Sequence, residues 1–488
     1  MNALTSQQAT IRYTSKWRDR PEFTLFSQGE RIVLPQTTWN IANLFLFIWS
    51  VSTAQTQTDT RDSKLAFRHE LPYPRVLIGY LMFPCCRAKA NSPLKMESTE
   101  TLDQAALADY VWIDRDEEAL ALWDDLADQT YLALDTESNS FHGYTSRICL
   151  IQIATADTVY LLDTLALAPE SFAGLGPILA DNHVVKIMHG SDNDLIGFKR
   201  EFGMDVDHLF DTMIAARYMN FQQRGLDALL RRYFGVHVSK KYQRLNWKLR
   251  PIPEDALQYA AGDVSYLLPM YGKMSDELFE MGRWDWVMED STLLTNREIP
   301  DKAFNPDGFW KMKGSRDLYP HQMAVLRELY LWRHEVCLEE DVAAFLLLDD
   351  RSMIEIARAR PTSVKQLLRL RGMNFRQVKR YKEELVEVVL DGIEAKPPKQ
   401  PPRKPRNPKS VPLNEAVYEA LRQWRQETAE KDELEIDLVA TKQMLQILSR
   451  SLPQTMEELE QLSGFTPWRI DRYGPAWLDF IKNHQSSS

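Results

Sequence analysis

The chain has 488 residues, of which 44% are hydrophobic and 26% are charged, and its formal net charge is −10. This length excludes a single ordinary core and indicates two to four domains, while the composition is that of a globular protein. Four cysteines are too few for a disulfide framework and lack zinc-ligand spacing, which favours a reducing compartment. A protein with a net negative charge needs local patches of basic residues, or bound cations, before it can bind a nucleic acid.

The first 95 residues differ in character from the rest, because they show no sustained helical or strand period. Their apolar stretch at 41–51 is far shorter than the roughly 20 residues that span a bilayer, so we predict no membrane span and no export. At Met96 an acidic, regularly patterned sequence begins. Two interpretations of residues 1–95 stay open: sequence upstream of a physiological start at Met96, or a genuine disordered or loosely folded extension.

From residue 108 to about residue 290 the sequence alternates between strand and helix patterns. Short apolar runs predict strands, and apolar residues at helical spacing predict an amphipathic helix. The strands are expected at 110–114, 131–134, 148–154, 158–163 and 186–189, and the first helix at 116–128. Strands first, then strand–helix alternation, predict a mixed sheet flanked by helices.

The rest of the chain reads as two helical blocks, 315–395 and 413–483, joined by a linker. The blocks share an apolar spacing that ends in a glycine, Gly372 in the first and Gly464 in the second, which indicates a tandem repeat of one small helical domain. The linker at 396–412 holds seven prolines, six Lys or Arg and no acid. It is interpreted either as an extended spacer or as a strap that contacts phosphates.

In the α/β region, carboxylate residues follow two of the expected strands. Asp135 and Glu137 follow the strand at 131–134 and point to one face because they are two residues apart. After the strand at 186–189 the chain turns and enters a helix, where Asp192 is expected as the N-cap and Asp194 lies inside. Taken singly, these patterns also fit a solvated strand end and a capping cluster.

A third segment places Tyr259 and Asp263 four residues apart on a predicted helix, which stacks a phenol beside a carboxylate. Alone, this pair also fits an ordinary hydrogen bond in a core. In this order and spacing, however, the three segments resemble the exonuclease motifs of the DEDD superfamily in its tyrosine branch.

Flanking sequences narrow the resemblance to ribonuclease D, and the two helical blocks resemble HRDC domains. The sequences that carry it are Leu134-Asp-Thr-Glu-Ser, Cys149-Leu-Ile-Gln-Ile-Ala, Leu209-Phe-Asp-Thr-Met and Asn246-Trp-Lys-Leu-Arg-Pro. The resemblance covers residues 108–483. It departs from the family at Asn246, where many relatives carry Asp, and at residues 1–95, which have no recognised counterpart.

The resemblance implies a fold of the α/β plus all-α class: a ribonuclease H-like mixed-sheet exonuclease domain at 108–290, followed by two small helical-bundle HRDC domains. It implies hydrolysis of RNA from the 3′ end with release of nucleoside 5′-monophosphates, using two divalent metal ions, Mg²⁺ or Mn²⁺. The expected substrates are tRNA precursors or other 3′-extended RNA. The expected state is a cytoplasmic monomer that contacts no membrane.

The resemblance also assigns roles to the motif residues. Asp135 is expected to bridge both metals, Glu137 and Asp263 to complete the first metal site, and Asp194 to serve the second, while Tyr259 orients or deprotonates the attacking water. The sequence further suggests contacts to RNA, in part from basic and aromatic residues of the helical blocks. These candidates are His189, Gln243, Arg371, Lys379 and Arg469.

Two rival functions stay open at this point: a DNA exonuclease, and an inactive RNA-binding scaffold on the same fold. The chain has no phosphate loop of a helicase. The presence of all four carboxylates and the tyrosine argues against the scaffold.

Overall fold

The computed structural model describes residues 23–27, 30–34, 109–299, 303–370, 375–400 and 411–485. The chain divides into two units, Met1–Arg87 and Ala88–Ser488. In the first unit, strand β1 (Phe23–Ser27) pairs antiparallel with β2 (Glu30–Leu34). Apart from these strands, the interpretation of residues 1–95 falls outside the described residues, as does most of the linker. Among the described residues, no helix combines the length and the apolar run that crossing a bilayer requires.

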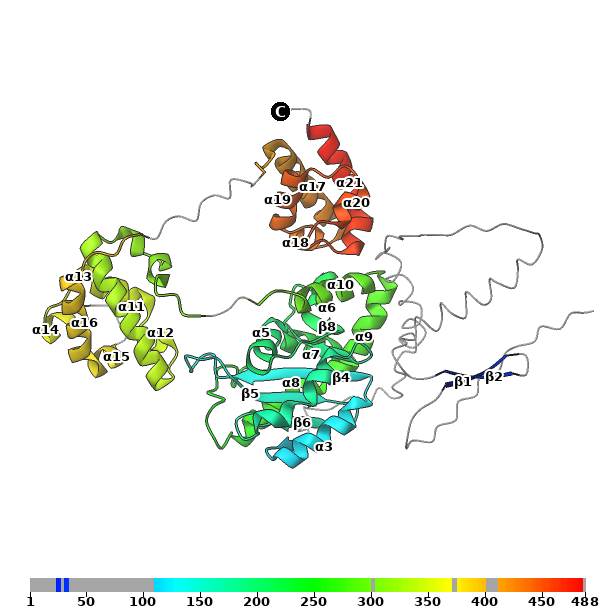
Figure 1. Cartoon of the computed structure of the whole chain (residues 1–488), viewed down its shortest axis with the longest axis horizontal. Coiled ribbons are helices and arrows are strands. Elements are labelled where there is room, and N and C mark those ends of the chain that lie inside the picture. The colour runs from blue at the N-terminus through cyan, green and yellow to red at the C-terminus, as the bar shows by residue number, and fades with distance from the viewer. Residues whose placement is uncertain are drawn as a thin grey trace, which may run out of the picture. The chain divides into compact units, whose positions relative to one another are not determined.

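A six-stranded mixed sheet organises the α/β region, with strand order β3-β6-β5-β4-β7-β8 (Figure 1). Strands β4, β5 and β6 run antiparallel to one another in turn, whereas β3 joins β6, β7 joins β4 and β8 joins β7 in parallel. The strands are β3 (Tyr110–Ile113), β4 (Tyr131–Ser138), β5 (Ile148–Ala154), β6 (Val159–Leu162), β7 (Val185–Met188) and β8 (Leu209–Asp211). The predicted mixed sheet is confirmed.

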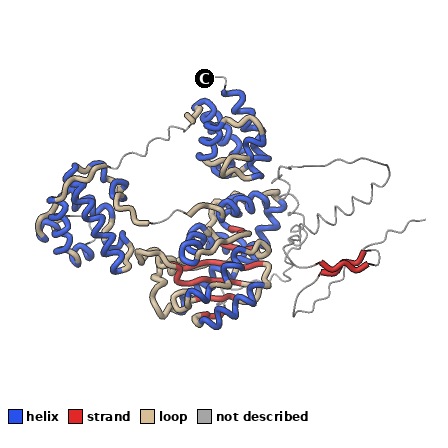
Figure 2. The backbone as a smooth tube through the Cα atoms, in the orientation of Figure 1, coloured by secondary structure: helices blue, strands red, loops and turns tan. Residues whose placement is uncertain are grey.

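Helices flank this sheet, as the tube view shows (Figure 2). One face packs against α3 (Asp116–Ala127), the short helix η1 (Pro169–Phe172), α4 (Leu175–Ala180), α5 (Asp192–Gly197) and the π-helical turn η2 (Phe198–Phe202). The other packs against α6 (Thr212–Tyr218), α7 (Leu226–Phe234), α8 (Glu254–Ser265), α9 (Leu267–Glu280) and α10 (Trp284–Thr295). Each face therefore has its own hydrophobic core.

Strand alternation decides which side chains enter which core. On β4, Leu132 and Leu134 lie in the core beneath α3 and α4, whereas Ala133 lies in the core beneath α8 and α9. Successive side chains of a strand point to opposite faces, so Asp135 shares the face of Ala133. The carboxylates of this strand are thereby directed toward α8.

Two local expectations were wrong in detail. Strand β4 does not end at residue 134, because its ladder with β5 continues through Asp135 and Glu137 to Ser138. The N-cap of α5 is Ser191, and Asp192 is the first residue of the helix. Asp192 instead forms an ion pair with Arg297, with 2.6 Å between Oδ1 and Nη1.

The two helical blocks follow. The first contains the short helices η3 (Gly308–Lys311) and η4 (Ser315–Asp317) and then α11 (Pro320–Glu340), α12 (Ala344–Leu347), α13 (Asp350–Ala359), α14 (Val364–Leu367), α15 (Phe375–Arg380) and α16 (Lys382–Glu394). The second contains α17 (Glu415–Asp432), α18 (Ile436–Val439), α19 (Lys442–Ser451), α20 (Met456–Glu460) and α21 (Pro467–Gln485).

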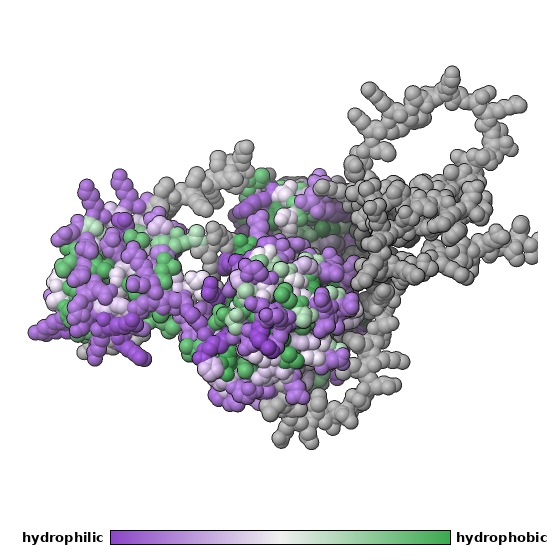
Figure 3. Space-filling model, turned by 60° about the horizontal axis from the view of Figure 1, so that its bottom comes forward, coloured by the Kyte–Doolittle hydropathy of each residue, from purple (hydrophilic) through white to green (hydrophobic). Residues whose placement is uncertain are grey.

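The internal repeat that the sequence predicts is visible in the structure, because equivalent helices of the two blocks have the same kind of N-cap. The Ser363 hydroxyl caps α14 by accepting from the backbone N–H of Gln366, and the Thr455 hydroxyl caps α20 in the same way, accepting from Glu458. On the face seen in Figure 3, hydrophilic side chains predominate over the described surface and hydrophobic ones form small separate groups.

Candidate active site

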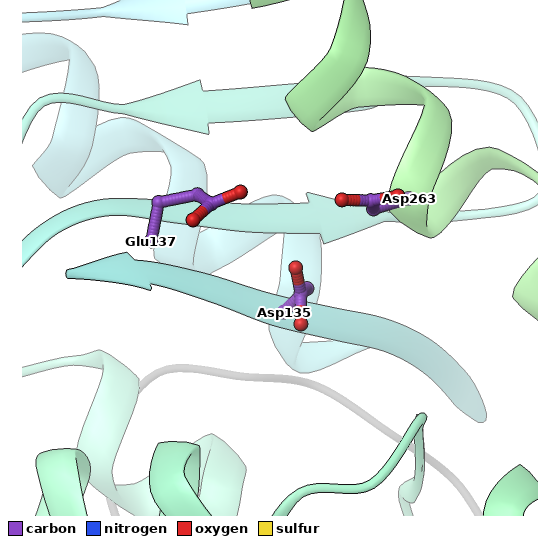
Figure 4. A group of neighbouring side chains, drawn as sticks. All are labelled: Asp135, Glu137 and Asp263. Carbon is purple, nitrogen blue, oxygen red and sulfur yellow. The ribbon is translucent and has the colours of Figure 1, made fainter. Parts of the chain in front are cut away.

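The carboxylates of β4 and α8 converge on one point. Asp135 and Glu137 project from β4, and Asp263 projects from α8, which packs across β4, β5 and β6. One carboxylate oxygen from each of the three residues lies within 4.8 Å of the other two (Figure 4). Three acidic oxygens at this spacing can bind a single divalent cation.

Asp194 joins this group from the first turn of α5. Its side chain is buried, and Thr136, which lies between Asp135 and Glu137, donates its hydroxyl to the Asp194 carboxylate at 2.5 Å. The negative charge of Asp194 acts directly on Asp135, whose pKa it raises. The four sequence-predicted carboxylates therefore share one region, although Asp194 is not among the three whose oxygens lie within 4.8 Å of one another.

Burial and mutual repulsion govern the protonation of this cluster. Desolvation, followed by the charges of the neighbouring carboxylates, raises the pKa values of Asp135 and Glu137 well above their usual range. Burial raises the pKa of Asp194 to about 6 and that of Asp263 to about 7. Carboxylates this close disfavour one another's ionised form, and a bound cation would relieve that repulsion. The donor set thus fits hard divalent metal ions.

Tyr259 lies one helical turn before Asp263 on α8, as the sequence spacing predicted. Burial and the nearby charge of Asp263 raise the pKa of the phenol. The ring packs against Trp247 and Tyr242, with ring centroids 6.4 and 5.9 Å away. These contacts hold the hydroxyl at the edge of the carboxylate cluster.

Asp211 supports the site in a way that the sequence did not reveal. Its carboxylate caps α6 by accepting from the backbone N–H groups of Met213 and Ile214. It also accepts from the N–H groups of Gly190 and Ser191, at 3.1 and 2.8 Å. Asp211 therefore ties the turn before α5 to the start of α6, and so fixes the helix that carries Asp194. Its place in the ribonuclease D-like segment 209–213 was the only available signal.

A cavity of about 700 Å³ opens beside the carboxylates, within the size range of small-ligand pockets. Its wall combines the catalytic candidates with polar and basic side chains from the segment 223–243. The basic residues of this wall are Arg224, Arg231 and Lys240. Arg224 forms an ion pair with Glu435, and Arg231 forms one with Asp227. Lys240 has no ion pair among the described residues, so its positive charge is the one available to a phosphate that approaches the carboxylates.

The five predicted RNA contacts fall into different environments. His189 and Gln243 line the cavity, and the His189 ring is hydrogen-bonded through Nδ1 to the hydroxyl of Thr212 at 2.9 Å. Lys379 is exposed on α15. Arg371 lies outside the described residues.

The structure contradicts the expectation for Arg469. Its side chain is buried, and its guanidinium donates to both carboxylate oxygens of Asp290, at 2.5 and 2.8 Å. It also donates to the hydroxyl of Thr466 and the carbonyl of Leu438. All of its donor nitrogens are occupied, so Arg469 stabilises packing and is not offered to a phosphate. A basic residue beside a tryptophan does not reveal in sequence which helix face is covered.

Similarity to known proteins agrees with this geometry. A family model described as 3′–5′ exonuclease matches residues 110–279, and one described as HRDC domain matches residues 322–389 and 414–481. Fold and site together define a 3′–5′ exonuclease domain with an acidic, metal-binding type of active site, followed by two HRDC domains.

The chain is 33% identical over 274 residues to ribonuclease D of Gluconacetobacter diazotrophicus, an alignment that covers 56% of this chain and 68% of that protein. The chain belongs to the ribonuclease D family. The crystal structure of Escherichia coli RNase D, 23% identical, matches with a TM-score of 0.53 over 77% of this chain and 99% of that chain, which shows the shared fold.

A second group of relatives is longer. Exosome complex component 10 of Mus musculus is 34% identical over 236 residues, which cover 47% of this chain and 26% of that protein. The chain therefore spans about a quarter of the length of this relative.

Proposed function

We propose that this chain is a divalent-metal-dependent exoribonuclease that removes nucleotides from the 3′ ends of RNA and releases nucleoside 5′-monophosphates. The observation that carries the proposal is the convergence of the Asp135, Glu137 and Asp263 oxygens within 4.8 Å, with Asp194 beside them. Membership of the ribonuclease D family supports RNA as the substrate, and 3′-extended tRNA precursors are the substrate we propose.

The donor set suits two Mg²⁺ or Mn²⁺ ions, because such cations prefer carboxylate oxygens. Asp135, Glu137 and Asp263 would hold one ion, and Asp135 together with Asp194 would hold the second. Bound in this way, the ions would supply Lewis-acid activation of water and neutralise charge on the phosphate.

The residues of the chain supply orientation and proton control. In hydrolysis of the terminal phosphodiester, a water oxygen bonds to phosphorus, the bond from phosphorus to the 3′ oxygen of the preceding nucleotide breaks, and that oxygen gains a proton. The Tyr259 hydroxyl, held against Asp263, is placed to hydrogen-bond the attacking water and orient it. Because its pKa is raised, the phenol keeps its proton, and its oxygen is free to accept a hydrogen bond from the water.

Residues of the cavity wall are proposed to bind the parts of the RNA on either side of the scissile bond. We assign the phosphates next to the scissile bond to Lys240, which lines the cavity with the carboxylates, because Arg224 and Arg231 on the same wall are ion-paired with Glu435 and Asp227. His189 and Gln243 lie on the same wall and are proposed to contact the terminal nucleotide. A cytoplasmic location and a monomeric state remain predictions from the sequence.

The decisive experiment compares three substrates of matched sequence: a 3′-extended tRNA, a single-stranded RNA and a single-stranded DNA. Each is incubated with metal-free protein and then with added Mg²⁺ or Mn²⁺, with Asp135→Asn as the matched inactive control. The proposal predicts metal-dependent shortening from the 3′ end of the RNA substrates, with mononucleotide products. Faster digestion of the DNA would favour the rival function, and metal-independent turnover would refute the metal assignment.

A further inference from the structure

One polar side chain in the centre of the sheet is not explained by any role described so far. Gln152 lies in the middle of β5 and is fully buried, and neither its Oε1 nor its Nε2 has a hydrogen-bond partner among the described residues. A buried amide left unpaired opposes folding, so it calls for a partner that the metal-bound state would supply.

The position of Gln152 in the sheet identifies that partner. Leu150 and Ala154, two residues away on the same strand, and Leu161, opposite on β6, all belong to the core beneath α8 and α9. On β4 the residue directly opposite Gln152 is Asp135. Of these four described side chains that flank Gln152 on this face, only Asp135 is polar.

The distance between opposed side chains in a sheet allows contact. Residues directly opposite in an antiparallel pair have Cβ atoms about 4.5–5.5 Å apart and point to the same face. A glutamine amide extends three bonds beyond its Cβ, so its N–H group can reach the carboxylate across the strand. Asp135 is also the residue on which the charges of Asp194, Asp263 and Glu137 all act.

We propose that Gln152 is a positioning residue for Asp135. Its Nε2 donates a hydrogen bond to the Asp135 carboxylate and thereby holds the orientation in which the oxygens face Glu137 and Asp263. The inference rests on the proposed function in one respect only, that Asp135 binds a divalent metal ion.

The chemistry of an amide suits this task better than the alternatives. A lysine or arginine at this position would neutralise Asp135 and compete with a cation for it. A leucine would leave a carboxylate oxygen facing hydrocarbon. A neutral donor satisfies the oxygen and leaves its negative charge available to the metal, as partners behind metal-binding carboxylates do.

The test uses the full chain with Gln152→Met, which keeps the length of the side chain and removes the amide. The matched control is Leu161→Met, a change of similar size on the opposite flank of Gln152, away from Asp135. Mn²⁺ binding to the metal-free proteins is measured by calorimetry, together with the thermal midpoint and the kcat on 3′-extended RNA.

We expect Gln152→Met to bind Mn²⁺ about 10-fold more weakly and to lose about 10-fold or more in kcat, while Leu161→Met keeps both values. An unpaired amide with no such role would give the opposite sign: a higher thermal midpoint with unchanged Mn²⁺ affinity, because a buried unpaired polar group has been removed. That result would overturn the proposal.

If Gln152→Met does not fold, Gln152→Asn keeps the amide one carbon short of Asp135 and is expected to weaken Mn²⁺ binding in the same way. Unchanged binding would again contradict the proposal. Failure of the proposed function is a separate result, since wild-type protein that binds Mn²⁺ but does not shorten RNA would leave the effect of Gln152 on Mn²⁺ binding measurable.

Discussion

The two faces of the central sheet are built from the same strands and serve different ends. Toward α3 and α4, strands β4 and β5 present buried apolar side chains, namely Leu132, Leu134, Ile151 and Ile153. Toward α8, the same two strands begin with apolar residues and then present Asp135, Glu137 and Gln152. Because side chains alternate, one strand can serve stability and chemistry at successive positions.

The difference has an energetic consequence. Burial of the leucines and isoleucines contributes about 1.5–3 kcal/mol for each side chain. On the other face, the raised pKa values of the carboxylates show that burying their charges opposes folding in the absence of a cation. Substitutions on the two faces should therefore separate activity from stability.

The largest expected effect is that of Asp135→Asn on the carboxylate face. Turnover should fall by at least about 1,000-fold, as is usual when one member of a catalytic unit is removed. The thermal midpoint of the metal-free protein should stay the same or rise, because one of several repelling buried carboxylates is gone. Digestion of 3′-labelled RNA and a melting curve measure the two effects, and substantial remaining turnover would show that Asp135 is not a metal ligand.

On the apolar face, Leu132→Ala should give the reverse pattern. Truncation of this fully buried side chain should lower the free energy of unfolding by about 3 kcal/mol, since it leaves a cavity. The kcat of the folded protein, measured well below its thermal midpoint, should stay close to that of the wild type. A large loss of kcat at full folding would mean that the two faces are not independent.

A smaller effect on activity is expected for Tyr259→Phe. Loss of the hydroxyl beside Asp263 should lower kcat by about 100-fold, the lower end of what positioned proton-transfer and orienting groups contribute. Mn²⁺ affinity should change little, because the four carboxylates remain. If calorimetry instead shows a marked loss of Mn²⁺ binding, the phenol acts on the metal site and not on the water.

The smallest effect concerns Lys186, a charge at the edge of the apolar face. Lys186 is paired in register with Leu132 and fully buried, its Nζ donates to the carbonyl of Asp181, and burial lowers its pKa from 10.5 to about 8. Between pH 8 and 10.5 the unfolded chain binds more protons than the folded protein, so this residue makes stability rise with pH in that window.

Compared with Lys186→Met, the wild type should therefore gain on the order of 1 kcal/mol of relative stability between pH 7.5 and 9.5. Urea unfolding of the two proteins at several pH values measures this difference. A constant difference across the window would show that Lys186 has an ordinary pKa in the folded protein.

Much of the fold could be predicted because its signals are local. The apolar runs at 148–154 and 186–189 and the helical spacing at 116–128 correspond to β5, β7 and α3 within a few residues. The repeat of the HRDC domains was visible for the same reason, since both copies carry the same caps and apolar spacing. Errors arose at element ends, where pairing with another strand extended β4 and Ser191 replaced Asp192 as the N-cap.

The sequence by itself determined which side chains share a face within one element: Asp135 with Glu137 on a strand, and Tyr259 with Asp263 on a helix. Those relations follow from the periods of strands and helices, which any chain obeys. Only the tertiary structure decided that the two pairs meet with Asp194, that Asp211 braces the turn before it, that Arg469 is buried against Asp290, and that Gln152 lies opposite Asp135. Contacts between distant elements depend on register and packing, which no local pattern encodes.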